Sequence, residues 1–255
     1  SEAYFERGLV NLQLGNLESA EKDFIKAVGL NPKLNESYVY LAQIKLLKGN
    51  DEKALEYLHK ASGSEENYKY FFYFGKIYFN NKEYEKAIDY FTKSIEKNPY
   101  LVDAYDLRAQ ALMEIREYEK SVNDFKKAYT LMPEEKRFFV EISNVYFLLA
   151  KEEYKKGNTE KSADYIVKGM EINYDIKLDE SFKNILIDAG KLLTDKNPEK
   201  AIIYFDFALR LVPDESEDYI KSHKEKEEIQ SLRKKAVKKL PLKERVVKFI
   251  SDLYG

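Results

Sequence analysis

The feature that most constrains this chain is an internal repeat of small residues, an aromatic residue and a proline. These residues return in the same order at offsets of 34 or 67 positions. The clearest sets are Gly8, Ala20, Phe24 and Pro32, then Gly75, Ala87, Phe91 and Pro99, then Ala109, Ser121, Phe125 and Pro133. A fixed period of this length is typical of arrays in which each repeat is one supersecondary unit. It disfavours an ordinary helical bundle, which needs no such spacing.

Each copy is expected to form two helices joined by a short turn. Within a copy, apolar residues recur at the i, i+3, i+4 and i+7 spacing of a helix with one buried face. Gly15-Asn16 and Gly49-Asn50 are suited to the turn within a copy, and Pro32 and Pro99 end its second helix. Glycine and proline number only 10 and 6 in 255 residues, which argues against an all-β fold rich in turns.

The pattern resembles the tetratricopeptide repeat, and the third copy matches it at every signature position. Those positions hold Phe71, Phe74, Gly75, Tyr78, Ala87, Phe91, Ser94 and Pro99. The resemblance implies an all-α fold, a right-handed α-solenoid of stacked helix pairs. We expect six copies over residues 1–215, starting near 1, 35, 68, 102, 136 and 182, then a capping helix at 216–240 and a short basic amphipathic tail helix at 241–255.

The fifth copy is longer than the pattern requires. Phe139 and Ala163 are 24 residues apart where the repeat expects 16. The eight extra residues amount to about two helical turns. Because no Gly or Pro interrupts 145–156, we expect an elongated first helix that ends near Gly157. The insertion is either a tolerated extension, which we favour, or a protruding contact surface.

In this family the first helices line a concave groove, and the resemblance implies a set of groove residues here. The set comprises Tyr40, Gln43, Lys69, Phe72, Tyr73, Lys76, Phe79, Asp103, Asp106, Gln110, Arg137, Asn144 and Phe147. We expect the aromatic members to anchor a peptide or helix of a protein partner, the amides to contact its backbone, and the charged members to give specificity. The alternative is that several of them pack between helices. A family-type clamp for a terminal carboxylate is not expected, because only Lys69 fits its pattern.

Composition argues against catalysis. The chain has no cysteine and only two histidines, His59 and His223, and it lacks a phosphate-binding glycine loop. We therefore expect no catalytic residue, no metal site, no cofactor and no small-molecule substrate. The sequence favours a non-catalytic scaffold for protein–protein interaction, with the regulatory repeat region of a larger enzyme as an alternative.

Charge is balanced overall but concentrated near the end of the chain. The formal net charge is −2, whereas residues 233–248 hold eight Lys or Arg and one Glu. A nucleic-acid partner is not expected from the overall balance. Residues 241–255 leave open an adaptor role on a membrane surface or nucleic acid, peripheral membrane contact, and self-association. No signal peptide is visible, which favours a cytoplasmic location. The start at Ser1, in mid-pattern, leaves open an upstream signal or domain.

Overall fold

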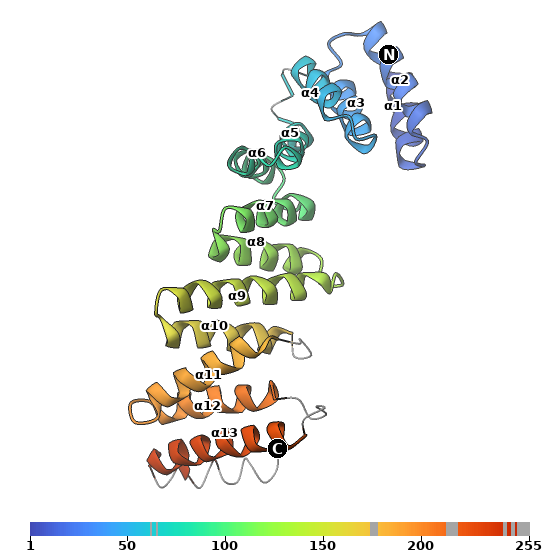
Figure 1. The fold of residues 1–255 in the computed structure, drawn as a ribbon. Helices are drawn as coiled ribbons and strands as arrows, with labels where there is room; N and C mark the ends of the chain where they lie inside the picture. The colour runs from blue at the N-terminus through green and yellow to red at the C-terminus, as the bar shows by residue number, and fades with distance from the viewer. Residues whose placement is uncertain are drawn as a thin grey trace. The chain divides into compact units, whose positions relative to one another are not determined.

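The computed structural model is all-α across the residues it describes, with thirteen helices and no strand there (Figure 1). The described residues are 1–61, 63–64, 66–173, 178–212, 219–241, 244–245 and 248. The predicted fold class is confirmed. The chain divides into two compact units, Ser1–Phe138 and Phe139–Gly255.

The first unit is a stack of helix pairs. Its helices are α1 (Glu2–Gln13), α2 (Leu17–Leu30), α3 (Asn35–Leu47), α4 (Asp51–Lys60), α5 (Tyr68–Asn80), α6 (Tyr84–Lys97), α7 (Val102–Glu114) and α8 (Tyr118–Leu131). Each helix contacts the next, and the first helices of successive pairs also touch, α3 with α5 and α5 with α7. One pair cannot bury its own apolar face, so stacking completes the core.

Glycine and phenylalanine bring the two helices of a pair together. A Cβ added to Gly75 on α5 would lie 2.6 Å from the ring of Phe91 on α6. Gly8 and Phe24 have the same relation between α1 and α2, where the corresponding distance is 2.8 Å. Both rings are fully buried. The repeat therefore needs a residue without a side chain wherever the ring lies this close to the opposite backbone.

Ion pairs tie the same two positions in the first and fourth pairs. Arg108 on α7 donates from Nε and Nη2 to the two carboxylate oxygens of Asp124 on α8, both at 2.7 Å. Arg7 on α1 binds Asp23 on α2 in the same two-pronged way, at 2.9 and 2.6 Å, and Asn11 donates to that carboxylate at 3.1 Å. Arg7, Asn11 and Asp23 of the first copy thus form one hydrogen-bonded cluster.

The second unit stacks its helices in the same manner but begins with a longer one. It contains α9 (Arg137–Lys155) from Phe139 onward, α10 (Thr159–Ile172), α11 (Glu180–Leu193), α12 (Pro198–Arg210) and α13 (Tyr219–Lys239). At 19 residues, α9 is longer than α1 to α8, which have 10 to 14. After it, Gly157 takes the left-handed conformation with φ 82°, and Asn158 precedes α10. The predicted elongated helix and its end are confirmed.

Glycine–phenylalanine contacts recur in the second unit at different positions. Phe147, on the first helix of its pair, lies against Gly169 on α10, with 2.6 Å between the ring and an added Cβ. In the next pair, Gly190 lies against Phe205 at 2.6 Å. By its repeat position, Ala189 corresponds to Gly75 of the third copy. Ala189 is fully buried, but the neighbouring glycine faces the ring.

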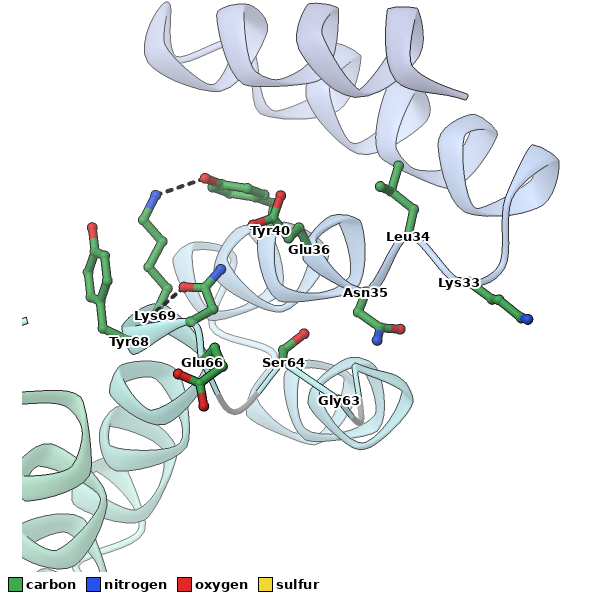
Figure 2. Close-up of a pocket in the computed structure, with 11 residues that line it drawn as sticks. Lys33, Leu34, Asn35, Glu36, Tyr40, Gly63, Ser64, Glu66, Tyr68 and Lys69 are labelled. Atoms are coloured by element: carbon green, nitrogen blue, oxygen red, sulfur yellow. Dashed lines mark hydrogen bonds between the residues drawn. The ribbon is translucent and has the colours of Figure 1, made fainter. Parts of the chain in front are cut away.

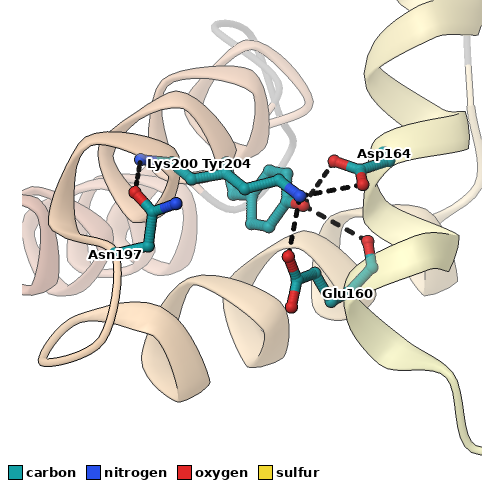
Figure 3. Close-up of polar contacts among 5 residues, drawn as sticks. All are labelled: Glu160, Asp164, Asn197, Lys200 and Tyr204. Atoms are coloured by element: carbon teal, nitrogen blue, oxygen red, sulfur yellow. Dashed lines mark hydrogen bonds and ion pairs between the residues drawn. The ribbon is translucent and has the colours of Figure 1, made fainter.

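A polar cluster joins α12 to α10, although α11 lies between these two helices in the sequence (Figure 3). The ammonium of Lys200 lies 2.7 Å from a carboxylate oxygen of Glu160 and 2.9 Å from one of Asp164. Tyr204 donates to Asp164 at 2.6 Å. Burial, and then the hydrogen bond to that carboxylate, raise the pKa of the Tyr204 phenol. Each polar side chain of the cluster has a partner within it, which indicates a structural role.

The last described helix covers the end of the core. Ile229 and Ala236 of α13 are buried in it, and Leu232 and Val237 pack against its edge. That 216–240 forms a separate capping segment with these bounds stays a prediction. The side chains of Tyr219 and Ile220 lie outside the described part. Most of 241–255 lies outside it as well. Among the described helices, none has the length and apolarity needed to cross a membrane.

Candidate functional site

Three first helices of the first unit surround a cavity of about 290 Å³, which we call the α3–α5–α7 cavity. Its lining residues are Gln43, Leu46 and Leu47 from α3, Phe72, Tyr73 and Lys76 from α5, and Asp103, Asp106 and Leu107 from α7. Six of them belong to the predicted groove set. Their side chains meet because the corresponding positions of successive first helices are stacked on one another.

Tyr73 presents an unsatisfied hydroxyl to this cavity. The residue is only 6% exposed, and its ring packs against Phe72 with 5.5 Å between centroids. Its hydroxyl has no hydrogen-bond partner among the residues that the structure describes. Burial raises the pKa of this phenol, and the neighbouring Tyr40, Tyr68 and Asp103 raise it further, so the group is a neutral donor. The hydroxyl is not fully enclosed, because the enclosed side-chain oxygens without a partner in the described part of the chain are those of Ser37 and Ser64. A ligand in the cavity can therefore reach the Tyr73 hydroxyl and form a hydrogen bond with it.

The charged residues of the cavity fall into two kinds. Asp106 is buried and satisfied: Arg137 donates to it at 2.6 Å and Gln110 at 2.9 Å. Lys76 and Asp103, in contrast, form no ion pair within the described part of the chain. The Lys76 ammonium lies 5.9 Å from the centroid of the Phe72 ring. One cation and one anion thus remain available to an occupant.

A second cavity of about 660 Å³, the loop cavity, lies where α3 and α5 begin (Figure 2). It is lined by Lys33, Leu34, Asn35, Glu36, Tyr40, Gly63, Ser64, Glu66, Asn67, Tyr68 and Lys69. Lys69 donates to the Tyr40 hydroxyl at 2.9 Å, as the dashed line in Figure 2 shows. The buried Ser64 hydroxyl has no hydrogen-bond partner among the described residues. Tyr40 and Lys69 of the predicted groove set are therefore paired with each other.

Five other members of the predicted set line neither cavity: Gln110 and Arg137, which donate to Asp106, and Phe79, Asn144 and Phe147. Phe79 is half-buried against Tyr84, with ring centroids 5.7 Å apart. In the second unit, Asn144 is half-buried, while Phe147 is buried in the core, its ring 5.3 Å from that of Phe182. Phe147 is therefore not the exposed anchor that we expected, because its ring fills the space opposite Gly169. Phe72 and Tyr73 are also buried, so they form the floor of the α3–α5–α7 cavity rather than projecting from it.

Sequence reasoning missed some of the lining. Leu46 and Leu107 are half-buried walls of the α3–α5–α7 cavity, next to positions counted as facing the groove. Asn35, Ser64 and Asn67 of the loop cavity lie at helix starts and in a connection, where the repeat pattern assigns no role. The one signal in the sequence was their polarity beside a helix start, which is equally typical of capping residues. Asn67 does cap α5, since it accepts from the backbone N–H of Lys69.

Comparison with protein-family models gives two matches. Residues 13–94 match the family described as "Anaphase-promoting complex, cyclosome, subunit 3", and residues 102–135 match the tetratricopeptide repeat. Human DnaJ homolog subfamily C member 3 is 28% identical over 151 residues, 59% of this chain and 26% of that protein. The BBSome complex member BBS4 homolog of Drosophila melanogaster is 22% identical over 182 residues, 66% of this chain and 36% of that protein. The chain thus spans about a quarter to a third of the length of these relatives.

Solved structures of similar fold include those of MamA and YrrB. The MamA protein aligns with a TM-score of 0.52 and 20% identity, covering 70% of this chain and 97% of MamA. YrrB, titled "a TPR protein with an unusual peptide-binding site", aligns with a TM-score of 0.52 and 18% identity, covering 68% of this chain and 86% of YrrB. At this identity the likeness establishes the fold and leaves the ligand to be argued from the residues.

Proposed function

We propose that this chain, a tetratricopeptide-repeat protein, is a non-catalytic scaffold that binds a segment of a protein partner in the groove of its first unit. The observation that carries the proposal is the α3–α5–α7 cavity. Six residues predicted from repeat positions line it, and it presents a hydroxyl and two charges that have no hydrogen-bond or ion-pair partner in the described part of the chain. Concave sites with apolar walls and a few converging polar groups are where proteins bind ligands.

The relatives support a binding role of this kind. One solved neighbour carries a peptide-binding site in its title, and one curated relative is named as a member of a complex. Another relative, the UDP-N-acetylglucosamine–peptide N-acetylglucosaminyltransferase of Giardia intestinalis, is matched over 10% of its length, and its activity is not carried over to this chain. The groups lining the cavity can form hydrogen bonds and ion pairs with a bound peptide, and their arrangement does not require a reaction.

Site-specific photo-crosslinking tests the proposal directly. Leu47 lines the α3–α5–α7 cavity and is 56% exposed, whereas Ile25 on α2 is 46% exposed and lies outside it. A photoreactive phenylalanine analogue at position 47 should crosslink to a discrete partner in a lysate of the source organism. The same analogue at position 25 should not capture that partner. Equal capture at both positions, or capture at position 25 alone, would place the binding surface elsewhere.

Charge reversal in the cavity gives a second, independent readout. Lys76→Glu should weaken capture of the crosslinked partner, because the ammonium lines the same cavity as position 47. Lys22→Glu provides the matched control, since Lys22 is exposed on α2. Both variants should keep the helical circular dichroism of the parent chain. Unchanged capture by Lys76→Glu would show that the cavity is not used.

A further inference from the structure

The groups left unpaired in the α3–α5–α7 cavity define the chemistry of an occupant. They are the hydroxyl of Tyr73, the ammonium of Lys76 and the carboxylate of Asp103. The first two donate hydrogen bonds and the third accepts them. An occupant that pairs with all three must carry both an acceptor and a donor.

The charges disfavour an ionised occupant. Lys76 and Asp103 line the same cavity, so a guanidinium bound there to Asp103 would share the cavity with Lys76, and a carboxylate bound to Lys76 would share it with Asp103. Like charges at close range in a partly buried site cost more than they do in water. A neutral group avoids this cost. It can accept from Lys76 or Tyr73 and donate to Asp103.

The walls favour an aromatic ring behind that neutral group. Leu46, Leu47 and Leu107 supply apolar surface, and the buried ring of Phe72 lies beside them. The volume of about 290 Å³ lies at the lower end of the range for ligand pockets, which leaves room for one large side chain. A phenol combines both requirements, because its ring is apolar and its hydroxyl both donates and accepts.

We propose that the α3–α5–α7 cavity binds a tyrosine side chain of the partner, with its hydroxyl placed between Tyr73, Lys76 and Asp103. The inference rests on the proposed function, since it specifies the partner for the same groove. It also predicts binding that depends little on salt, because the bound group carries no net charge.

Small probes of each side-chain class test the proposal without a known partner. We would titrate the full ¹⁵N-labelled chain with p-cresol, toluene, butyramide, butylguanidinium and butyrate, and follow amide shifts of α3, α5 and α7 by NMR. p-Cresol should bind most tightly of the five. Tyr73→Phe should weaken p-cresol by about fivefold to tenfold, the equivalent of one hydrogen bond, and leave toluene unchanged.

Matched variants separate this effect from a general loss of structure. Tyr100→Phe alters a tyrosine that is 78% exposed and outside the cavity, and it should change no probe. Lys76→Met removes the cation while Asp103 stays, so butylguanidinium should then bind severalfold more tightly than to the parent chain.

Three results would overturn the inference: tighter binding of butylguanidinium, butyrate or butyramide than of p-cresol, equal p-cresol affinity in Tyr73→Phe, or shifts confined to other helices. None of these outcomes decides the crosslinking experiment. A partner captured at position 47 together with failure of the phenol probe would retain the scaffold and reject tyrosine as its anchor.

Discussion

The helix pairs α5–α6 and α9–α10 achieve the same close approach with the roles of the two helices exchanged. In α5–α6, the first helix supplies Gly75 and the second supplies the ring of Phe91. In α9–α10, the first helix supplies the ring of Phe147 and the second supplies Gly169. The contact distances are equal, 2.6 Å to an added Cβ in both pairs. What these two pairs share is a phenylalanine ring packed against a glycine, and either helix of the pair can supply the ring.

The largest expected effect follows from removing either ring. Phe91→Ala and Phe147→Ala should each lower the free energy of unfolding by about 3–5 kcal/mol, because each leaves a cavity in a packed interior. Urea titration followed by circular dichroism measures the loss, and hydrogen exchange assigns it to the affected helix pair. Tyr100→Ala is the control, since Tyr100 is largely exposed.

This prediction can break the comparison. If Phe91→Ala is strongly destabilising and Phe147→Ala is close to neutral, Phe147 does not fill the place of Phe91. The residue would then behave as the surface anchor that its repeat position suggested. Losses of similar size would establish the exchange.

A smaller effect is expected from adding one methyl group on the glycine side. Gly75→Ala and Gly169→Ala should each cost about 1–3 kcal/mol, because the new Cβ would overlap a buried ring that must shift. Gly29→Ala on α2 is the matched control: nothing lies within 4 Å of its Cβ, so it should gain up to about 1 kcal/mol from helix propensity. Thermal and urea unfolding of the three variants measure these differences.

A double variant sharpens the same point. Adding Phe91→Leu to Gly75→Ala should cost less than the sum of the two single changes, because the smaller side chain leaves room for the methyl group. Additive losses would mean that the glycine and the ring do not share one contact.

The regular pairs could be predicted from the sequence because their rules are local. Gly75, Phe91 and Pro99 each act within one copy, and a 34-residue period repeats the action. Phe147 escaped prediction because two extra turns in α9 change which side chains reach the partner helix. Counting from the start of the copy gave it a groove position, whereas the position opposite Gly169 decides where its ring lies.

Only part of the lining of the cavities could be predicted from the sequence, and the pairing of its side chains could not be predicted. Repeat positions indicated Tyr73, Lys76, Asp103 and Asp106 as neighbours, and they do line one cavity. That Asp106 is satisfied by Arg137 depends on a contact between residues 31 apart in sequence. That the Tyr73 hydroxyl has no partner in the described part of the chain likewise depends on its distances to groups in neighbouring copies. Such facts follow from distances between copies, and a pattern within one copy does not contain them.

The smallest expected difference between the two pairs lies near the end of the first helix. There, a carboxylate makes the stability of one pair depend on pH. In the last turn of α9, the buried carboxylate of Glu153 accepts from Lys156 at 2.9 Å and from Asn158 at 2.8 Å, and Lys161 lies 3.3 Å away. The corresponding turn after α5 has Glu83, which is 42% exposed and pairs with Lys86. Only the former carboxylate is therefore held in a buried network.

These contacts, those from Lys156 and Asn158 first, lower the pKa of Glu153 from 4.5 to about 2. A folded-state pKa below the unfolded value means that the stabilisation is complete above pH 4.5 and is lost as the pH falls toward 2. Glu153→Gln should therefore flatten the acid side of the stability curve in that interval, as followed by urea unfolding at a series of pH values. Glu171→Gln, at an exposed position of α10, should keep the slope of the parent chain. A slope that Glu153→Gln leaves unchanged would show that the turn after α9 is no more tied by charge than the turn after α5.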